Sequence, residues 1–411
     1  MLPTFDPVLL ALECLLLLSG MALAVLAHRR DWRPGIALIL LTGLGLRLSM
    51  LALAVITDVR PQDLDIDFHA AGINALAHRD PALHAVRDLG WNYLPTYALF
   101  LAANEWVSQT LDLSWMLVSR IGPVFFDLGV ALLVGRLATR REAFQYACFP
   151  LPVLVSAVHG QMEPLCLLFA VGAFVVLRRP WLAGLLLGLA ISVKTWPALF
   201  IPALLLGLPG WRERRQALAA MFALLGALLV TMPLTVGTPV AQMPEVVKIM
   251  LGYSPVIGTW GWSSVLLSFA PDVDQTLVGR IGTLLTLSAV IAGIWLWRRA
   301  HAVDVAQVSA SAFQVVTAAH GVQYLSWAGP FATARQTGRL LVLQGALGLY
   351  AAVGYLVLGL SRPQTYSAWS DWYFPASLLV IPLILFAQPW SRREAPAPVS
   401  APRQELAGSP A

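Results

Sequence analysis

The chain has 411 residues, of which 58% are hydrophobic and only 12% are charged, an apolar excess that soluble globular proteins do not have. Its formal net charge of +5 comes mainly from arginines that lie in small clusters between apolar segments. A nucleic-acid-binding protein would gather its basic residues on one soluble face, so the sequence argues against that class. Apolar stretches of about 20 residues recur along the chain, which predicts an all-α, polytopic helical bundle in the lipid bilayer.

The basic clusters set the predicted topology. They recur from residues 28–33 to residues 392–393, and the positive-inside rule places all of them in the cytoplasm. That placement requires an odd number of crossings, with the N-terminus on the outer side. We expect about 11–13 transmembrane segments. The clear spans are residues 8–28, 35–57, 115–137, 143–158, 162–177, 216–235, 276–297, 340–360 and 372–389.

The first apolar segment is predicted to remain in the mature protein. It is followed by His28-Arg29-Arg30, where a signal peptide would have the small residues of a cleavage site, and no basic residue precedes it. We therefore expect residues 1–34 to add one transmembrane helix to the main bundle.

Two charged residues lie in the middle of predicted spans. Arg47 belongs to span 35–57 and Asp127 to span 115–137, at about equal depth from the outer ends. Because an isolated charge inside a membrane is rarely tolerated, we expect a structural ion pair between them.

Residues 58–113 are predicted to form one long extracytoplasmic loop. Segment 93–107 within it is apolar but short, and counting it as a crossing would move the arginines of residues 136–141 to the outer side. We expect it to form a juxtamembrane helix on the outer surface. Near its start the loop carries an acidic stretch, Asp63-Leu64-Asp65-Ile66-Asp67-Phe68-His69.

The acidic stretch has two interpretations. Asp65 and Asp67 could be ordinary acids of a solvated loop, which are common. They could also act in catalysis, because a carboxylate next to an acceptor hydroxyl can serve as a general base. The nearby His69, His78 and His84 follow no compact ligand spacing, so a divalent metal is possible but is not supported, and we expect no cofactor.

A very short turn, His159-Gly160-Gln161-Met162-Glu163-Pro164, connects two spans on the same side as the acidic loop. Its polar groups could simply meet water. Several hydrogen-bonding positions in so short a connection also suit the recognition of a sugar, which needs many directed donors and acceptors.

Two regions are too short to cross the membrane twice. The region between Arg179 and Arg212 has about 30 residues, whereas two full crossings need about 40, and two prolines interrupt it. We predict a broken hairpin there with Lys194 at its tip, and a second within residues 304–335 with its tip near His320-Gly321-Val322-Gln323-Tyr324. Non-helical backbone at membrane depth is tolerated where it lines a cavity, so both tips predict a shared outer pocket.

Lys194 is costly in apolar surroundings unless a counter-charge is present. Its side chain could extend to the membrane interface. A lipid phosphate would neutralise it better, because a flexible ammonium is a good phosphate ligand.

Taken in order, these motifs resemble the GT-C class of membrane glycosyltransferases, and most of all the bacterial polyprenol-phosphate-mannose-dependent mannosyltransferases. The resemblance covers roughly residues 35–335. It rests on the acidic stretch, Asn92-Tyr93-Leu94-Pro95, Arg120 with Phe126-Asp127, the turn at residues 159–164, Val193-Lys194-Thr195-Trp196-Pro197 and Gln323-Tyr324-Leu325-Ser326-Trp327.

This resemblance implies an inverting transfer of a hexose, with mannose expected, from a polyprenyl-phosphate donor to a glycan or glycolipid acceptor. The reaction would take place at the extracytoplasmic face of the plasma (inner) membrane. It implies Asp67 as the catalytic base and Asp65 as its partner. The expected substrate-binding residues are Lys194, Arg120, His159, Gln161, Glu163, Tyr93, Gln323 and Tyr324.

The resemblance over residues 35–335, together with apolar length and composition beyond them, predicts an organisation for the chain. Residues 35–335 would form the catalytic membrane domain, residues 336–389 the C-terminal transmembrane helices, and residues 390–411 a disordered cytoplasmic tail. A transporter or lipid flippase is the competing function, because broken helices are typical of that class too. A transporter would more naturally have related halves and polar groups on both faces, whereas the polar tips here gather on one side.

Overall fold

The chain folds almost entirely into α-helices, which confirms the predicted fold class. The computed structural model describes residues 6–61, 63–84, 93–251, 256–335, 339–358 and 372–392, and these residues contain no β-strand. Among them, five helices are long and apolar enough to cross a bilayer. They are α1 (Pro7–Arg29), α2 (Ile36–Ile56), α6 (Trp115–Leu137), α16 (Gln275–Trp297) and the helix Arg339–Val357, which includes α19 (Arg339–Ala352). The protein is thus a multi-pass membrane protein.

Shorter apolar helices fill the space between the long ones. They are Pro150–His159, α9 (Glu163–Val175), α10 (Pro180–Val193), Trp196–Gly207, α17 (Ala302–Val316) and Trp372–Phe386. Several lie in the interior of the bundle, as α9 does between α6 and α10. Polar helix α7 (Arg140–Cys148) precedes the first of them.

Both regions predicted to be broken hairpins are interrupted where expected. The first is α10, then Lys194 in extended backbone, then the 3-10 turn η3 (Trp196–Phe200) and α11 (Ile201–Gly207). Proline at the start of η3 and of α11 explains the break, because proline cannot donate the backbone hydrogen bond of a continuous helix.

The second interrupted region follows α17. Residues 317–321 are not helical, and the 3-10 turn η5 (Val322–Ser326) and the short helix α18 (Gly329–Ala334) follow them. Non-helical backbone in both regions leaves peptide groups and side chains available to line a cavity.

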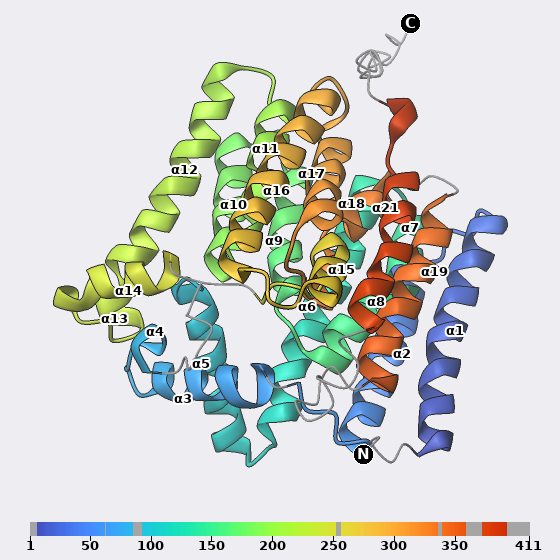
Figure 1. The fold of residues 1–411 in the computed structure, drawn as a ribbon, viewed down its shortest axis with the longest axis horizontal. Coiled ribbons are helices and arrows are strands. Elements are labelled where there is room, and N and C mark those ends of the chain that lie inside the picture. Colours follow the sequence, from blue (N-terminus) through green and yellow to red (C-terminus); the bar gives the residue numbers. More distant parts are fainter. Residues whose placement is uncertain are drawn as a thin grey trace, which may run out of the picture.

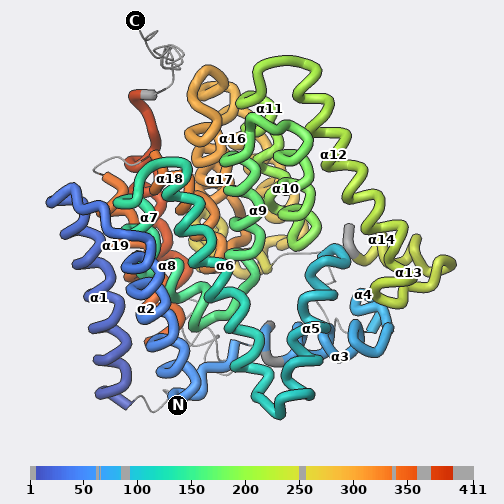
Figure 2. The backbone as a smooth tube through the Cα atoms, turned by 180° about the vertical axis from the view of Figure 1, so that it is seen from behind, coloured from blue at the N-terminus to red at the C-terminus, as the bar shows by residue number. Residues whose placement is uncertain are grey.

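A separate layer covers one end of the bundle. It consists of α3 (His69–Leu76), α4 (Pro81–His84) and α5 (Pro95–Leu111), at the lower end in Figure 1. The arginine-rich start of α12 (Trp211–Val230) and the connection from α16 to α17, which holds Arg298 and Arg299, lie at the opposite end in both views (Figures 1 and 2). This arrangement is what an outer loop opposite the basic clusters would produce.

The acidic stretch is not an extended loop. Residues Asp63–Phe68 form a single π-helical turn, η1, which runs directly into α3. Most of segment 93–107 belongs to the 17-residue helix α5, which begins at Pro95 and packs on α3 and α6. The predicted tail lies, apart from residues 390–392, outside the described residues.

Arg47 and Asp127 form the ion pair that the sequence predicts. The Arg47 Nη2 lies 2.6 Å from the Asp127 carboxylate, and both side chains are buried. Arg47 also donates to the carbonyl of Ala147 at 2.8 Å, and the Tyr146 hydroxyl donates to Asp127 at 2.8 Å. The pair therefore joins α2, α6 and α7 at one point.

Candidate functional site

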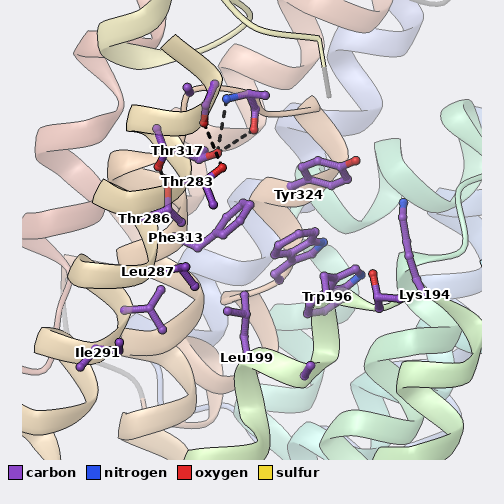
Figure 3. Close-up of a pocket in the computed structure, with 18 of the residues that line it drawn as sticks. Lys194, Trp196, Leu199, Thr283, Thr286, Leu287, Ile291, Phe313, Thr317 and Tyr324 are labelled. Atoms are coloured by element: carbon purple, nitrogen blue, oxygen red, sulfur yellow. Dashed lines mark hydrogen bonds between the residues drawn. The ribbon is translucent and has the colours of Figure 1, made fainter. Parts of the chain in front are cut away.

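A cavity of about 590 Å³ lies between the two broken hairpins and α16 (Figure 3). Its wall is mainly apolar, and its lining side chains include Leu199 of η3, Leu287 and Ile291 of α16, and Phe313 of α17. Leu287 and Ile291 also remain 53% and 65% exposed. The cavity therefore opens toward the lipid, at the perimeter of the helical bundle along α16. An apolar cavity with such an opening suits a long hydrocarbon chain.

Lys194 stands at the polar end of this cavity. Its ammonium donates to Glu163 Oε1 at 2.7 Å and lies 5.7 Å from the ring centroid of Tyr93 and 5.1 Å from that of Tyr324. Both charged side chains are buried. The carboxylate and the two aromatic faces together compensate a positive charge that burial alone would make unfavourable.

The aromatic side chains of the two broken hairpins meet in the cavity wall. The rings of Trp196 and Trp327 stack with centroids 4.1 Å apart and only 4° between their planes. Tyr324 and Phe313 pack against Trp327 with centroids 4.6 and 5.1 Å away. Contacts between the hairpins therefore fix the shape of the cavity next to Lys194.

The acidic turn connects to this site through Tyr93. The ring of Phe68, the last residue of η1, packs edge-on against Tyr93 at 5.8 Å and Tyr97 at 5.1 Å. Since Tyr93 also contacts Lys194, its ring links the acidic turn to the lysine. Asp67 is half-buried here, and the side chain of Asp65 is outside the described residues.

The turn at residues 159–164 packs closely against the acidic turn and α6. His159 Nδ1 lies 2.8 Å from the Tyr355 hydroxyl, and the Gln161 amide nitrogen lies 3.3 Å from His159 Nε2. Gly160 has a φ of +75°, and a Cβ there would come within 2.9 Å of both Arg120 and Leu64. Glycine thus permits the close approach of this turn to α6 and the acidic turn.

Comparison with known families gives a direct match. The family model "Glycosyltransferase family 87" matches residues 91–320, which is more than half of the chain. The chain belongs to glycosyltransferase family 87. No curated protein matches the sequence. The protein is therefore a membrane glycosyltransferase, and it requires a sugar donor and an acceptor.

The family 87 match places most of the predicted site inside the matched region. Residues 91–320 include Tyr93, Arg120, the turn at residues 159–164 and Lys194, whereas the acidic turn precedes the match. Lys194, Glu163, Tyr93 and Tyr324 come together directly.

Two of the predicted binding residues have less direct positions in this glycosyltransferase. Arg120 donates to the carbonyl of Val59, so it holds the chain that leads into the acidic turn. Gln323 is partly buried, and its side chain folds back over Gly321.

A histidine–carboxylate pair that none of the sequence motifs indicated lies in the layer α3–α5 of the enzyme. His69 Nε2 lies 3.2 Å from Glu105 Oε2, and the His69 ring stacks on Trp115 at 4.8 Å. Glu105 is buried in α5 and also accepts from the Gln109 amide at 2.7 Å. A carboxylate inside an otherwise apolar segment was the available signal. Within the described residues, no group of three His, Cys, Asp or Glu side chains could hold a metal ion.

Proposed function

We propose that this family 87 glycosyltransferase moves a hexose, with mannose as the first candidate, from a polyprenyl-phosphate donor to a glycan or glycolipid acceptor. The observation that carries the proposal is the apolar cavity that ends at buried Lys194. A polyprenyl phosphate has this same polarity, since a long hydrocarbon chain ends in an anion. A nucleotide sugar does not, and the sequence has no glycine-rich phosphate loop for it.

The cavity would bind the hydrocarbon chain and Lys194 the phosphate. Each buried CH₂ group contributes about 0.8 kcal/mol, so a few isoprene units supply substantial binding energy. As the sugar leaves, negative charge develops on the phosphate, and a fixed ammonium next to it stabilises that charge. Lys194 is therefore proposed to act in donor binding and in leaving-group stabilisation.

The proposed reaction is a single displacement. The acceptor hydroxyl oxygen attacks C1 of the sugar, the bond from C1 to the phosphate oxygen breaks, and its electron pair stays on the polyprenyl phosphate. The hydroxyl proton passes to the carboxylate of Asp67, and the configuration at C1 inverts. The position of η1 next to Tyr93 supports Asp67 in this role, with Asp65 proposed as its partner.

The remaining predicted residues would surround the sugar. His159 and Gln161 form a hydrogen-bonding pair in the turn that ends near the acidic turn, and Glu163 continues the same turn to Lys194. We propose that these groups bind sugar hydroxyls, that Arg120 orders the acidic turn, and that Gln323 completes the donor side. The layer α3–α5 would face the extracytoplasmic side of the plasma membrane.

A direct assay tests the proposal. Purified protein is mixed with short-chain polyprenyl-phosphate mannose, glucose and arabinose in turn, with a membrane glycolipid extract as acceptor, and release of the polyprenyl phosphate is measured. Release from at least one of them is expected, with mannose fastest. Transfer from a nucleotide sugar alone would overturn the lipid-linked donor.

A further inference from the structure

Two buried indole N–H groups in the cavity wall have no hydrogen-bond acceptor among the described residues. They belong to Trp196, at the start of η3, and Trp327, directly after η5. Their side chains are 9% and 2% exposed. Buried donors without acceptors are rare in folded proteins, so each such group calls for an explanation.

Other buried indoles of the chain show that this is not a general property of its packing. Trp115 donates to the carbonyl of Leu64 at 2.9 Å, and Trp260 donates to that of Gln314 at 2.6 Å. The unsatisfied indoles are the two that stack on each other and line the cavity. The missing acceptor is therefore expected from a ligand inside the cavity.

The two indoles lie near a positive charge, which an anion-binding site needs. Lys194 lines the same cavity two residues before Trp196. Figure 3 shows Trp196 and Lys194 together at this end of the cavity, with Leu199 and Ile291 farther along the wall. Because Trp327 stacks on Trp196, both indoles belong to the part of the cavity wall that adjoins Lys194.

We propose that the indole N–H groups of Trp196 and Trp327 donate hydrogen bonds to the phosphate of the lipid-linked donor. An indole can only donate, and so can an ammonium. Their common ligand is therefore an acceptor, and phosphate oxygens accept several hydrogen bonds without bringing protons that need acceptors of their own. The charge of a phosphate also matches the ammonium, which a neutral sugar hydroxyl does not. The identity of the phosphate as a lipid headgroup rests on the proposed function.

Glu163 explains why uncharged donors are needed. Its carboxylate already holds the Lys194 ammonium at 2.7 Å, and the same carboxylate repels an incoming phosphate. The indoles add hydrogen bonds to the anion without forming an ion pair to Glu163. Because one indole comes from each broken hairpin, a bound phosphate would also bridge the two hairpins.

The test removes the indole N–H and keeps an aromatic side chain at each position. Binding of farnesyl phosphate, farnesol and inorganic phosphate is measured on the full-length protein and on Trp196→Phe, Trp327→Phe and the double variant. Farnesyl phosphate should bind about tenfold more weakly to each single variant, as for the loss of a hydrogen bond to a charged group, while farnesol binding stays unchanged. Inorganic phosphate should compete with farnesyl phosphate less well in the variants. Trp181→Phe is the matched control, because Trp181 is exposed on α10.

The outcomes separate this inference from the proposed function. Unchanged farnesyl phosphate binding in the variants, or an equal loss for farnesol, overturns the inference while transfer by the wild type upholds the function. Indole-dependent binding without any transfer supports the inference and overturns the function. No binding by the wild type overturns both. If the phenylalanine variants do not fold, benzothienylalanine in place of Trp196 keeps the ring shape and replaces the N–H by sulfur.

Discussion

Lys194 and Glu163 form a buried ion pair across 31 residues of sequence, with the ammonium 2.7 Å from the carboxylate. The pair joins the tip of the first broken hairpin to the start of α9. Burial of two opposite charges costs desolvation that their attraction only partly offsets. A site that retains such a pair has a reason to hold an ammonium there, and donor binding is the reason proposed above.

Substitutions of this pair should separate stability from donor binding. Lys194→Gln leaves the Glu163 carboxylate buried without its counter-charge, which costs about 3–5 kcal/mol of unfolding free energy. The double variant Lys194→Gln/Glu163→Gln removes both charges and should recover most of that stability. Donor affinity should fall about 10–100-fold in Lys194→Gln, because the charged phosphate contact is lost, and removal of the Glu163 charge in the double variant should restore only part of it. Thermal unfolding in detergent and farnesyl phosphate binding measure the two effects. Full recovery of affinity in the double variant would contradict the phosphate role.

Asp67→Asn should abolish turnover and leave donor binding intact. The amide keeps the size of the side chain but cannot accept the acceptor's proton, so we expect a loss of about 10²–10⁴-fold in the rate constant. The measurement is release of polyprenyl phosphate at saturating donor and acceptor. Asp58→Asn is the control, since Asp58 is an exposed acid of the same loop and pairs with exposed Arg60. Near-native turnover in Asp67→Asn would move the base to Asp65 or Glu163.

Arg47 and Asp127 should show a strong coupling in stability. Arg47→Leu leaves a buried carboxylate uncompensated and should cost about 3–5 kcal/mol, whereas Arg47→Leu/Asp127→Leu should cost less than the sum of the single variants. Thermal unfolding in detergent provides the cycle. The exposed pair of Arg33 and Asp31 is the control, and Arg33→Leu there should cost at most about 1 kcal/mol. Strictly additive losses would show that the pair does not stabilise the bundle.

The layer α3–α5 should face the extracytoplasmic side. A cysteine at exposed Ala77, after α3, should react with a membrane-impermeant reagent in intact cells, in a background without Cys14, Cys148 and Cys166. A cysteine at exposed Arg140 should react only after the cells are opened. The reverse pattern would invert the topology and place the site in the cytoplasm.

The layer α3–α5 should lose stability as the pH rises through the range where Asp80 ionises. Burial raises the pKa of Asp80, which accepts from the hydroxyl of Thr238. A carboxyl with a raised folded-state pKa contributes stability below its unfolded pKa of about 3.9 and loses it as the pH passes the folded pKa. Asp80→Asn should therefore unfold at a higher temperature than the wild type near pH 7 and at a similar temperature near pH 4. A constant difference across this range would exclude Asp80 as the cause.

Much of the fold follows from local properties of the sequence. Apolar length predicts α1, α2, α6 and α16, and proline explains the break after Lys194. Equal depth in two spans was enough to pair Arg47 with Asp127. These features depend on residues whose preferred environment is decided within one segment.

The details of the site depend on how separate segments pack, and no local pattern encodes that. The sequence placed Lys194 and Glu163 in the same pocket without identifying them as partners. Trp196 and Trp327 occur in two of the motifs that resemble the family, but the motifs indicate no role for either residue. In the structure their rings stack. The helical form of the acidic stretch could not be predicted either, because three aspartates in six residues favour neither helix nor loop strongly.

The opening of the cavity along Leu287 and Ile291 would give the proposed lipid-linked donor access to the site from within the bilayer. A donor that enters through this opening approaches by lateral diffusion within the membrane and never dissolves in water. The quantity that saturates the enzyme is then the mole fraction of donor in the bilayer or micelle. Adding empty detergent micelles at constant total donor should lower the rate by surface dilution, whereas adding buffer alone should not.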